Sequence, residues 1–413
     1  MNREMKHSGI AWAELIPSHW NVERGKHVLT LMQRQVREDD EIITCFRDGE
    51  VILRKLRRED GFTMSDKEIG YQGINVGDIV IHGMDGFAGA IGVSKSQGKG
   101  TPVYVVCTTK DNSNNSYIVY YLRTLAQNNV FLALATGIRE RSCDLKWNKI
   151  SVLPFLLPPI SEQKAIADFL DKKCGEIDEL VALQEKIIEE LKSYKQSVIT
   201  ETVCKGLNPN APMKDSGVDW IGKIPNQWVA CKLKHVYTLL NGRAYSDSEL
   251  LTDGKYKILR VGNLFTSDKW YYSDLELEDN KYCQNGDLLY GWSASIGPYL
   301  WNQEKVIYHY HIWKVLFTNN RKFAFYQLHA LTEAKRRDMH GSAMQHLTMV
   351  GMNNSFLAMP PLAEQEEIAD YLDKKCSEID QLISIKQQKI VELKDYKKSL
   401  IYEYTTGKKE VKL

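Results

Sequence analysis

Apolar side chains recur at intervals of four and three residues in two long stretches of the chain, which begin near residues 160 and 362. This 3.5-residue spacing is typical of the packing seam of a coiled coil. It predicts two long helices, the first running from Ser161 to Lys205 over about 65 Å at ~1.5 Å per residue. The predicted packing positions are Ile166, Leu170, Ile177, Leu180, Leu191 and Tyr194 in the first helix, and Ile368, Leu372, Ile379, Leu382, Leu393 and Tyr396 in the second.

The two helical stretches are copies of one sequence. Residues 158–197 match residues 360–399 at 23 of 40 positions at a constant offset of 202, which chance does not explain. A second repeated block opens each half of the chain at an offset of 208. Since a helix with one apolar seam needs a partner, we expect the two copies to pack antiparallel within the chain. The opening blocks share Ser8-Gly9, Trp12, Ile16-Pro17 and Trp20 with Ser216-Gly217, Trp220, Ile224-Pro225 and Trp228.

The segments between the repeated blocks resemble each other little. Strand-like runs are predicted at 41–46, 78–82 and 103–107, and at 257–261, 287–290 and 306–313, with shorter helices at 117–135 and 321–337. The predicted fold class is therefore mixed α+β, with two α/β domains separated by two long antiparallel helices that form an intramolecular coiled coil and a pseudo-two-fold repeat. The expected boundaries are 1–157 and 207–359 for the domains, and 158–206 and 360–413 for the helices.

Charge is distributed unevenly along the chain. The formal net charge is +1, but Ser161 to Thr200 contains nine acidic and six basic residues, which leaves the basic surplus outside this helix. Basic and aromatic residues near predicted loops are therefore the candidates for binding DNA, although for each of them a solvated surface charge is the alternative interpretation. These candidates are Arg54, Lys55, Arg57, Arg58, Arg139, Arg141, Lys146 and Lys149 in the first domain, and Arg243, Tyr245, Lys335, Arg336, Arg337 and Gln345 in the second.

Sequence signatures of catalysis are missing. No glycine-rich cofactor loop with an Asn/Asp-Pro-Pro-aromatic motif indicates a methyltransferase, and no GxxxxGK[ST] motif indicates an ATPase. The eight cysteines form no CxxC pair, and His309 and His311 are better explained as alternate residues of one strand than as metal ligands. We predict no catalytic residue, no metal site and no membrane span, and with no signal peptide we expect a cytoplasmic protein.

The repeated motifs resemble those of type I restriction-modification specificity subunits. The motif Ser-Gly-x-x-Trp-x-x-x-Ile-Pro-x-x-Trp begins at Ser8 and Ser216, and Pro-Pro-x-x-Glu-Gln-x-x-Ile-Ala-x-x-Leu-Asp begins at Pro158 and Pro360. The resemblance implies that the two domains are target-recognition domains, each reading one half of an asymmetric bipartite site in double-stranded DNA. The helices would be conserved spacers that set the distance between the half-sites.

The resemblance also implies the partners and their cofactors. Two methyltransferase subunits would dock on the helix pair, and two restriction subunits would complete a complex with adenine-N6 DNA methyltransferase and site-specific deoxyribonuclease activity. S-adenosylmethionine, ATP and Mg would serve those partners, and this chain would bind no cofactor itself. Two alternatives stay open at this point: a recognition subunit of another restriction class, and a coiled-coil adaptor with no role in DNA binding.

Overall fold

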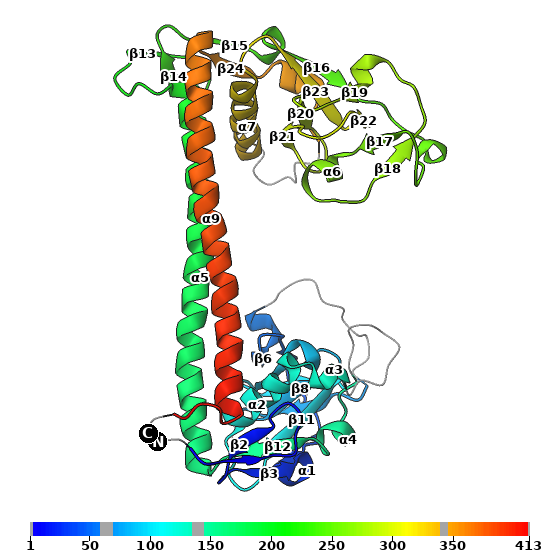
Figure 1. Ribbon diagram of the computed structural model, residues 1–413, viewed down its shortest axis with the longest axis vertical. Coiled ribbons are helices and arrows are strands. Elements are labelled where there is room, and N and C mark those ends of the chain that lie inside the picture. The colour runs from blue at the N-terminus through cyan, green and yellow to red at the C-terminus, as the bar shows by residue number, and fades with distance from the viewer. Residues whose placement is uncertain (1–2, 58–68, 134–143, 339–345, 412–413) are drawn as a thin grey trace. The chain divides into compact units, whose positions relative to one another are not determined.

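The computed structural model of the chain describes residues 3–57, 69–133, 144–338 and 346–411. The chain forms two compact units. Unit 1 consists of Met1–Glu185 and Gln388–Leu413, and unit 2 consists of Lys186–Gln387. Each unit thus includes part of both long helices, α5 (Ile160–Lys205) and α9 (Leu362–Thr405), which Figure 1 shows. The division into four segments expected from the sequence stays a prediction.

Unit 1 is built on a four-stranded antiparallel sheet in the order β4-β11-β8-β9, accompanied by the two-stranded sheets β1-β2, β3-β12, β5-β6 and β7-β10. Its strands are β1 (Met5–His7), β2 (Leu15–Pro17), β3 (Asn21–Arg24), β4 (Leu29–Leu31), β5 (Ile43–Cys45), β6 (Val51–Leu53), β7 (Gln72–Ile74), β8 (Ile79–His82), β9 (Ile91–Val93), β10 (Gly98–Gly100), β11 (Tyr104–Thr109) and β12 (Pro154–Leu157). Its shorter helices are α1 (Gly25–Val28), η1 (Arg54–Leu56), η2 (Gly86–Ala88), α2 (Asn115–Gln127), α3 (Val130–Ala133) and α4 (Trp147–Ile150).

Unit 2 contains two four-stranded sheets, in the orders β16-β23-β20-β21 and β18-β17-β22-β19, and the pairs β13-β14 and β15-β24. Its strands are β13 (Met213–Asp215), β14 (Lys223–Pro225), β15 (Val229–Lys232), β16 (Tyr237–Asn241), β17 (Tyr256–Leu259), β18 (Tyr271–Ser273), β19 (Tyr282–Cys283), β20 (Leu288–Gly291), β21 (Gly297–Leu300), β22 (Val306–Tyr308), β23 (Ile312–Phe317) and β24 (Phe356–Met359). Its shorter helices are η3 (Leu233–His235), η4 (Asp247–Glu249), α6 (Val261–Phe265), η5 (Asp279–Lys281), α7 (Arg321–Asp338) and α8 (Met349–Asn353).

The two units share one frame. The sheet β4-β11-β8-β9 of unit 1 corresponds strand for strand to β16-β23-β20-β21 of unit 2, and the pairs β1-β2 and β3-β12 correspond to β13-β14 and β15-β24. Outside this frame the units differ, because unit 2 has the sheet β18-β17-β22-β19, with β17 parallel to β22, where the described part of unit 1 has the pairs β5-β6 and β7-β10. The sequence repeat is therefore also a structural repeat.

Within each unit, a stretch of α5 packs antiparallel against a stretch of α9. In unit 1, Asp178 of α5 pairs with Lys397 of α9 at 2.6 Å, and Glu185, further along α5, pairs with Lys394, which lies earlier on α9. In unit 2, Lys195 pairs with Asp380 at 2.6 Å. The predicted fold class is confirmed: the chain is mixed α/β, with two domains and two long helices that pack on each other.

The buried side of the helices differs from the predicted seam at four of the twelve predicted positions. The structure buries Leu170 and Ile177 as predicted, but leaves Leu180 and Tyr194 44% and 50% exposed, while Val181 is buried. Adjacent apolar pairs such as Leu180 and Val181 let two registers fit the same pattern, so spacing alone could not choose between them. Of the other predicted positions, Ile166, Ile368, Leu372 and Ile379 are buried, Leu191 and Leu393 are half-buried, and Leu382 and Tyr396 are 47% and 55% exposed.

The repeated helix motif anchors each helix to its own unit. Buried Gln163 accepts a hydrogen bond from the backbone N–H of Asn114 at 3.0 Å, and Gln365 accepts one from Asn320 at 3.2 Å. Asp171 accepts a 2.7 Å hydrogen bond from the Tyr120 hydroxyl, and Asp373 accepts one of the same length from Tyr326. The Gln and Asp of the motif therefore tie each long helix to the first turns of the shorter helix of its own unit, α2 or α7.

Two predicted elements are interrupted in the structure. The single strand expected at 306–313 is two strands, β22 and β23, which belong to different sheets and are joined by a bend at residues 309–311. The helix expected at 117–135 is α2 followed by α3, with a break at Asn129, whose φ of 58° lies in the left-handed region; residues 134 and 135 fall outside the described ones. Among the described residues, no helix is both long and apolar enough to cross a membrane.

Candidate nucleic-acid interface

Three chain segments meet at one end of the sheet β4-β11-β8-β9 in unit 1, and three equivalent segments meet at the same end of β16-β23-β20-β21 in unit 2. In unit 1, the residue that follows β8, Gly83, donates from its N–H to Val103 at 2.9 Å and accepts from Leu145 at 2.9 Å. In unit 2, the residue that follows β20, Trp292, donates to His311 at 3.1 Å and accepts from Leu347 at 2.9 Å. We call this place the sheet end of each unit; the backbone builds it in the same way twice.

The side chains at the two sheet ends differ. A Cβ atom added to Gly83 would lie 2.7 Å from the carbonyl oxygen of Val103, so the backbone of unit 1 has no room for a side chain there. The equivalent residue of unit 2 is a tryptophan, Trp292, whose indole N–H donates to the carbonyl oxygen of Tyr310 at 2.8 Å. The frame is thus repeated, while the chemistry displayed at its sheet end is not.

In unit 1, several predicted DNA-binding residues are ion-paired within the chain. Lys55 pairs with Glu41 at 2.6 Å, and Lys146, next to the sheet end, pairs with Asp144 at 3.2 Å. Arg57 pairs with Asp48 at 2.5 Å and Glu50 at 3.1 Å, and its guanidinium lies 4.3 Å from the Phe46 ring centroid. Arg54 donates to the Thr44 hydroxyl at 3.0 Å, and Lys149 lies in α4. A phosphate would have to compete with these carboxylates for the paired cations.

In unit 2, the structure brings Arg243 and Tyr245 to the sheet end. The N–H of Arg243 donates to the Tyr308 carbonyl at 3.1 Å, and its own carbonyl accepts from Tyr310 at 3.0 Å. Its guanidinium donates to the Glu249 carboxylate at 2.6 Å, and this hydrogen bond lowers the pKa of Glu249 to about 2. The guanidinium also lies 5.2 Å from the ring centroid of Tyr245. Arg243 is therefore held in a fixed position beside the bend at 309–311.

The other candidates of unit 2 lie on the last turns of α7. Arg336 pairs with Glu333 and donates to the carbonyl oxygen of Ile296 at 2.8 Å, which ties the helix to the turn after β20. Lys335 is half-buried and Arg337 is exposed, and both lie on the same helix. The remaining candidates, Arg58, Arg139, Arg141 and Gln345, lie outside the described residues. Whether any of these side chains contacts DNA stays a prediction.

Sequence reasoning missed the rings around Trp292. His309 and His311 were expected on a continuous strand, where alternation accounts for them, but they lie in the bend between β22 and β23 at the sheet end. Trp292 itself follows Gly291, and nothing in its neighbourhood in the sequence marks it. The one available signal was the density of aromatic and imidazole side chains from Tyr308 to Trp313.

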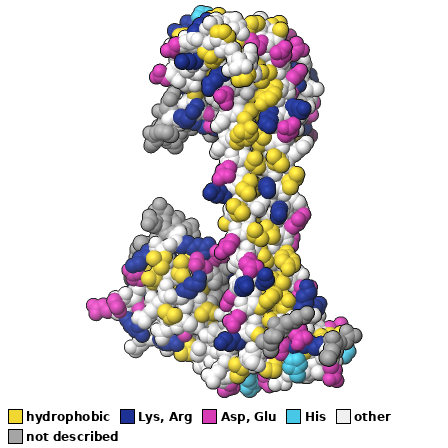
Figure 2. Space-filling model, turned by 90° about the vertical axis from the view of Figure 1, so that its left-hand side faces the viewer, with side chains coloured by type: hydrophobic (Ala, Val, Ile, Leu, Met, Phe, Trp, Pro, Cys, Tyr) yellow, Lys and Arg dark blue, Asp and Glu magenta, His cyan; other side chains and the backbone are white. Residues whose placement is uncertain are grey.

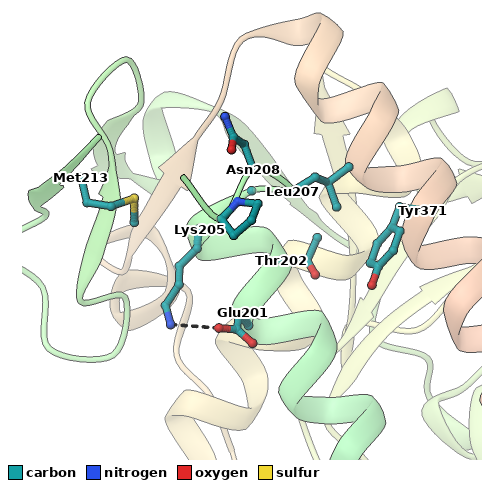
Figure 3. Close-up of a pocket in the computed structure, with 9 residues that line it drawn as sticks. Glu201, Thr202, Lys205, Leu207, Asn208, Met213 and Tyr371 are labelled. Atoms are coloured by element: carbon teal, nitrogen blue, oxygen red, sulfur yellow. Dashed lines mark hydrogen bonds and ion pairs between the residues drawn. The ribbon is translucent and has the colours of Figure 1, made fainter. Parts of the chain in front are cut away.

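The cavity in Figure 3 belongs to the frame of unit 2 and is separate from the sheet end. It has a volume of about 790 Å³ and lies where α5 ends, with Thr202 and Tyr371 among its lining residues and an ion pair between Lys205 and Glu201 at 3.1 Å. In unit 1, the repeat-equivalent of Thr202 is Tyr404, whose ring centroid lies 4.5 Å from that of Phe169. Of the predicted DNA-binding residues that the structure describes, none lines this cavity.

Comparison with known proteins gives consistent matches. Residues 225–395 match the family model described as type I restriction modification DNA specificity domain. The chain is 28% identical over 277 residues to the type I restriction enzyme MjaVIII specificity subunit of Methanocaldococcus jannaschii, a match that covers 62% of each protein. It is also 21% identical over 199 residues to the EcoBI specificity subunit of Escherichia coli, covering 47% of this chain and 42% of that one. The matched region thus spans less than two thirds of these relatives.

Two solved structures share the fold. One is a chain from a study of complex assembly and conformational transition of the type I R-M system, with a TM-score of 0.73 and 15% identity over 94% of this chain and 98% of that one. The other is the HsdS subunit from Thermoanaerobacter tengcongensis, with a TM-score of 0.52 and 16% identity over 95% and 98% of the two chains. These matches show that residues 225–395 resemble the type I restriction modification DNA specificity domain, and that the chain is similar to specificity subunits in sequence and to the two solved structures in fold.

Proposed function

We propose that this chain is the DNA-specificity subunit of a type I restriction-modification complex. Each unit reads one half of an asymmetric bipartite site, and the helix pair sets the number of unread base pairs between the halves. The observation that carries the proposal is the contrast between a frame built twice from the same contacts and two sheet ends with different side chains. Two-fold-related readers suit the two antiparallel strands of DNA, and unlike side chains predict unlike half-sites.

The helix pair also offers surfaces for partner subunits. Exposed apolar side chains on packed helices are typical of protein interfaces, and Figure 2 shows such side chains along the helical region. They occur at repeat-equivalent positions, Leu180 with Leu382 and Leu183 with Ile385, each pair split between units 1 and 2. Two equivalent surfaces support docking of two methyltransferase subunits, which would carry S-adenosylmethionine and flip out the adenine to be methylated.

The remaining activities belong to partners. In this proposal the chain is not an enzyme by itself; two restriction subunits that use ATP and Mg complete the nuclease. Among the described residues, no group of three or more His, Cys, Asp or Glu side chains is arranged to hold a metal ion.

Selection from a random duplex library, with the chain and its cognate methyltransferase together, tests the proposal. We expect enrichment of a split site with two unequal halves separated by a fixed number of unread base pairs. An enriched continuous site would indicate a recognition subunit of another restriction class. No enriched sequence would support the adaptor alternative and refute the specificity function.

A further inference from the structure

Aromatic and imidazole rings cluster at the sheet end of unit 2. The Trp292 ring centroid lies 5.0 Å from that of His311, 6.0 Å from that of Tyr310 and 6.2 Å from that of His346. Behind it, the Trp313 ring stacks on the indole at 5.7 Å. The Ser293 hydroxyl forms a 2.9 Å hydrogen bond with Nδ1 of His346. We call Trp292, Tyr310, His311 and His346 the ring cluster.

The ring cluster remains open to solvent. Tyr310 is 38% exposed, His346 is exposed, and Trp292 and His311 are only half-buried. No described residue forms a hydrogen bond with the imidazole nitrogens of His311. Large rings that are held in place and yet uncovered are characteristic of binding surfaces rather than of a core.

The ring cluster is not needed to build the sheet end. Unit 1 makes the same two backbone hydrogen bonds with a glycine, Gly83, at the position of Trp292. The rings are therefore an addition to a frame that closes without them. In a protein whose two units share their frame, such an addition is the natural place for what distinguishes one half-site from the other.

The imidazoles of the bend, those of His309 and His311, carry little charge at neutral pH. Burial, together with His311 and Arg260, lowers the pKa of His309 to about 4, and burial, together with His346 and Arg260, lowers the pKa of His311. A neutral imidazole presents one N–H donor and one acceptor nitrogen. Base edges present donors and acceptors in sequence-dependent patterns, whereas phosphates bind mainly cations. The ring cluster is thus suited to base edges, and the nearby Arg243 and Arg260 to phosphate or guanine.

We infer that Trp292, Tyr310, His311 and His346 form the base-reading surface of unit 2 and specify base pairs of its half-site in double-stranded DNA. The inference rests on the proposed function and adds to it which side chains read. Trp292 positions the imidazoles through edge-to-face ring contacts, and His311 and His346 contact the base edges.

The test uses the full chain with its methyltransferase and the same random duplex library, comparing wild type, His311→Ala and His346→Ala. Loss of a base contact should reduce the preference at one or two base pairs of one half-site by about tenfold, with the other half-site unchanged. The salt dependence of binding should also stay unchanged, because no phosphate-binding charge is lost. His235→Ala is the matched control, since His235 is an exposed histidine of the same unit outside the ring cluster.

Each outcome decides the inference. Both variants selecting the wild-type site at full preference would overturn it, as would uniformly weaker binding with a shallower salt dependence, which indicates phosphate contact. Thermal unfolding checks that each variant is folded; His346→Gln, at an exposed position, replaces any variant that is not. If the wild type selects a split site but the variants keep its full preference, this inference fails and the proposed function stands. If the wild type selects no site, both fail.

Discussion

The sheet ends of the two units are built from the same backbone contacts and differ in the side chain that follows the strand. Unit 1 places a glycine, Gly83, where a Cβ atom would meet Val103, and unit 2 places Trp292, which contacts the rings of His311 and Trp313. The helices and the motifs that anchor them show the opposite behaviour, since their contacts recur in both units almost without change. The contacts that hold each helix to its unit are therefore repeated, whereas the side chain displayed at the sheet end, our proposed reading surface, is not.

If the exposed apolar positions of the helices are equivalent docking surfaces, their variants should have equal effects. Leu180→Asp and Leu382→Asp should each weaken binding of one methyltransferase by about 2–4 kcal/mol, and the double variant should bind neither. Isothermal titration with the methyltransferase measures both stoichiometry and affinity. Ala182→Asp places the same charge about 200° around α5 from Leu180 and should bind normally. Unequal effects of the two leucine variants would break the equivalence of the units.

The glycine of the first sheet end should be intolerant of a side chain. Gly83→Ala should lower the free energy of unfolding of unit 1 by about 1–3 kcal/mol, because the new Cβ forces the backbone away from Val103. Gly175→Ala on α5, where no heavy atom lies within 4 Å of the added Cβ, should stabilise the protein by about 0.5–1 kcal/mol. Urea unfolding of both variants measures the difference. Gly83→Ala with wild-type stability would contradict the close approach.

Acid should destabilise the start of α5 through Glu162. Burial opposes ionisation of Glu162, but hydrogen bonds from His19 and Arg3 outweigh it and lower the pKa of Glu162 below 4.5. Because the folded pKa is depressed, the stability from this carboxylate is fully present above pH 4.5 and is lost as the pH falls through the lowered value.

Glu162→Gln should therefore lower the free energy of unfolding by about 1–2 kcal/mol at neutral pH, and by progressively less in acid. Its counterpart Glu364 accepts a 2.9 Å hydrogen bond from the indole N–H of Trp228, which a glutamine also accepts, so Glu364→Gln should cost less than about 1 kcal/mol. Denaturant unfolding across the acid range compares the two variants. A Glu162→Gln deficit that does not shrink in acid would show that charge is not its cause.

The smallest effects are expected at the repeated ion pairs between the helices. Asp178→Asn removes the pair with Lys397, and Asp380→Asn removes the pair with Lys195. The side chains of Asp178 and Asp380 are 63% and 57% exposed. Each substitution should lower the free energy of unfolding by about 0.5 kcal/mol, and by less in high salt. Thermal unfolding at two salt concentrations measures this, and a cost unaffected by salt would point to packing instead.

The repeat made much of the fold predictable. The two long helices and their antiparallel pairing follow from residues that occur twice at a fixed offset, and the mixed α/β domains follow from the strand-like runs between the repeated blocks. The seam register did not follow, because neighbouring apolar residues such as Leu180 and Val181 satisfy two registers equally. Choosing between them requires knowing which side of each helix meets its partner.

The candidate site was less predictable, for a physical reason. Arg243 was identified by its residue type, but its pairing with Glu249 and its place beside Tyr308 depend on strands distant in sequence. Trp292 gave no local signal, since its role arises only where the end of β20 meets the bend before β23. A sequence identifies candidate residue types, but it does not show which side chains from distant strands come together in the folded chain.

The most direct measurement exchanges residues 30–150 for those of a relative and maps the methylated adenines in cells that express the chimera with its partners. The two-reader account predicts that one half of the methylated site changes while the other half and the number of base pairs between them stay the same. A change in both halves, or in neither, would contradict it.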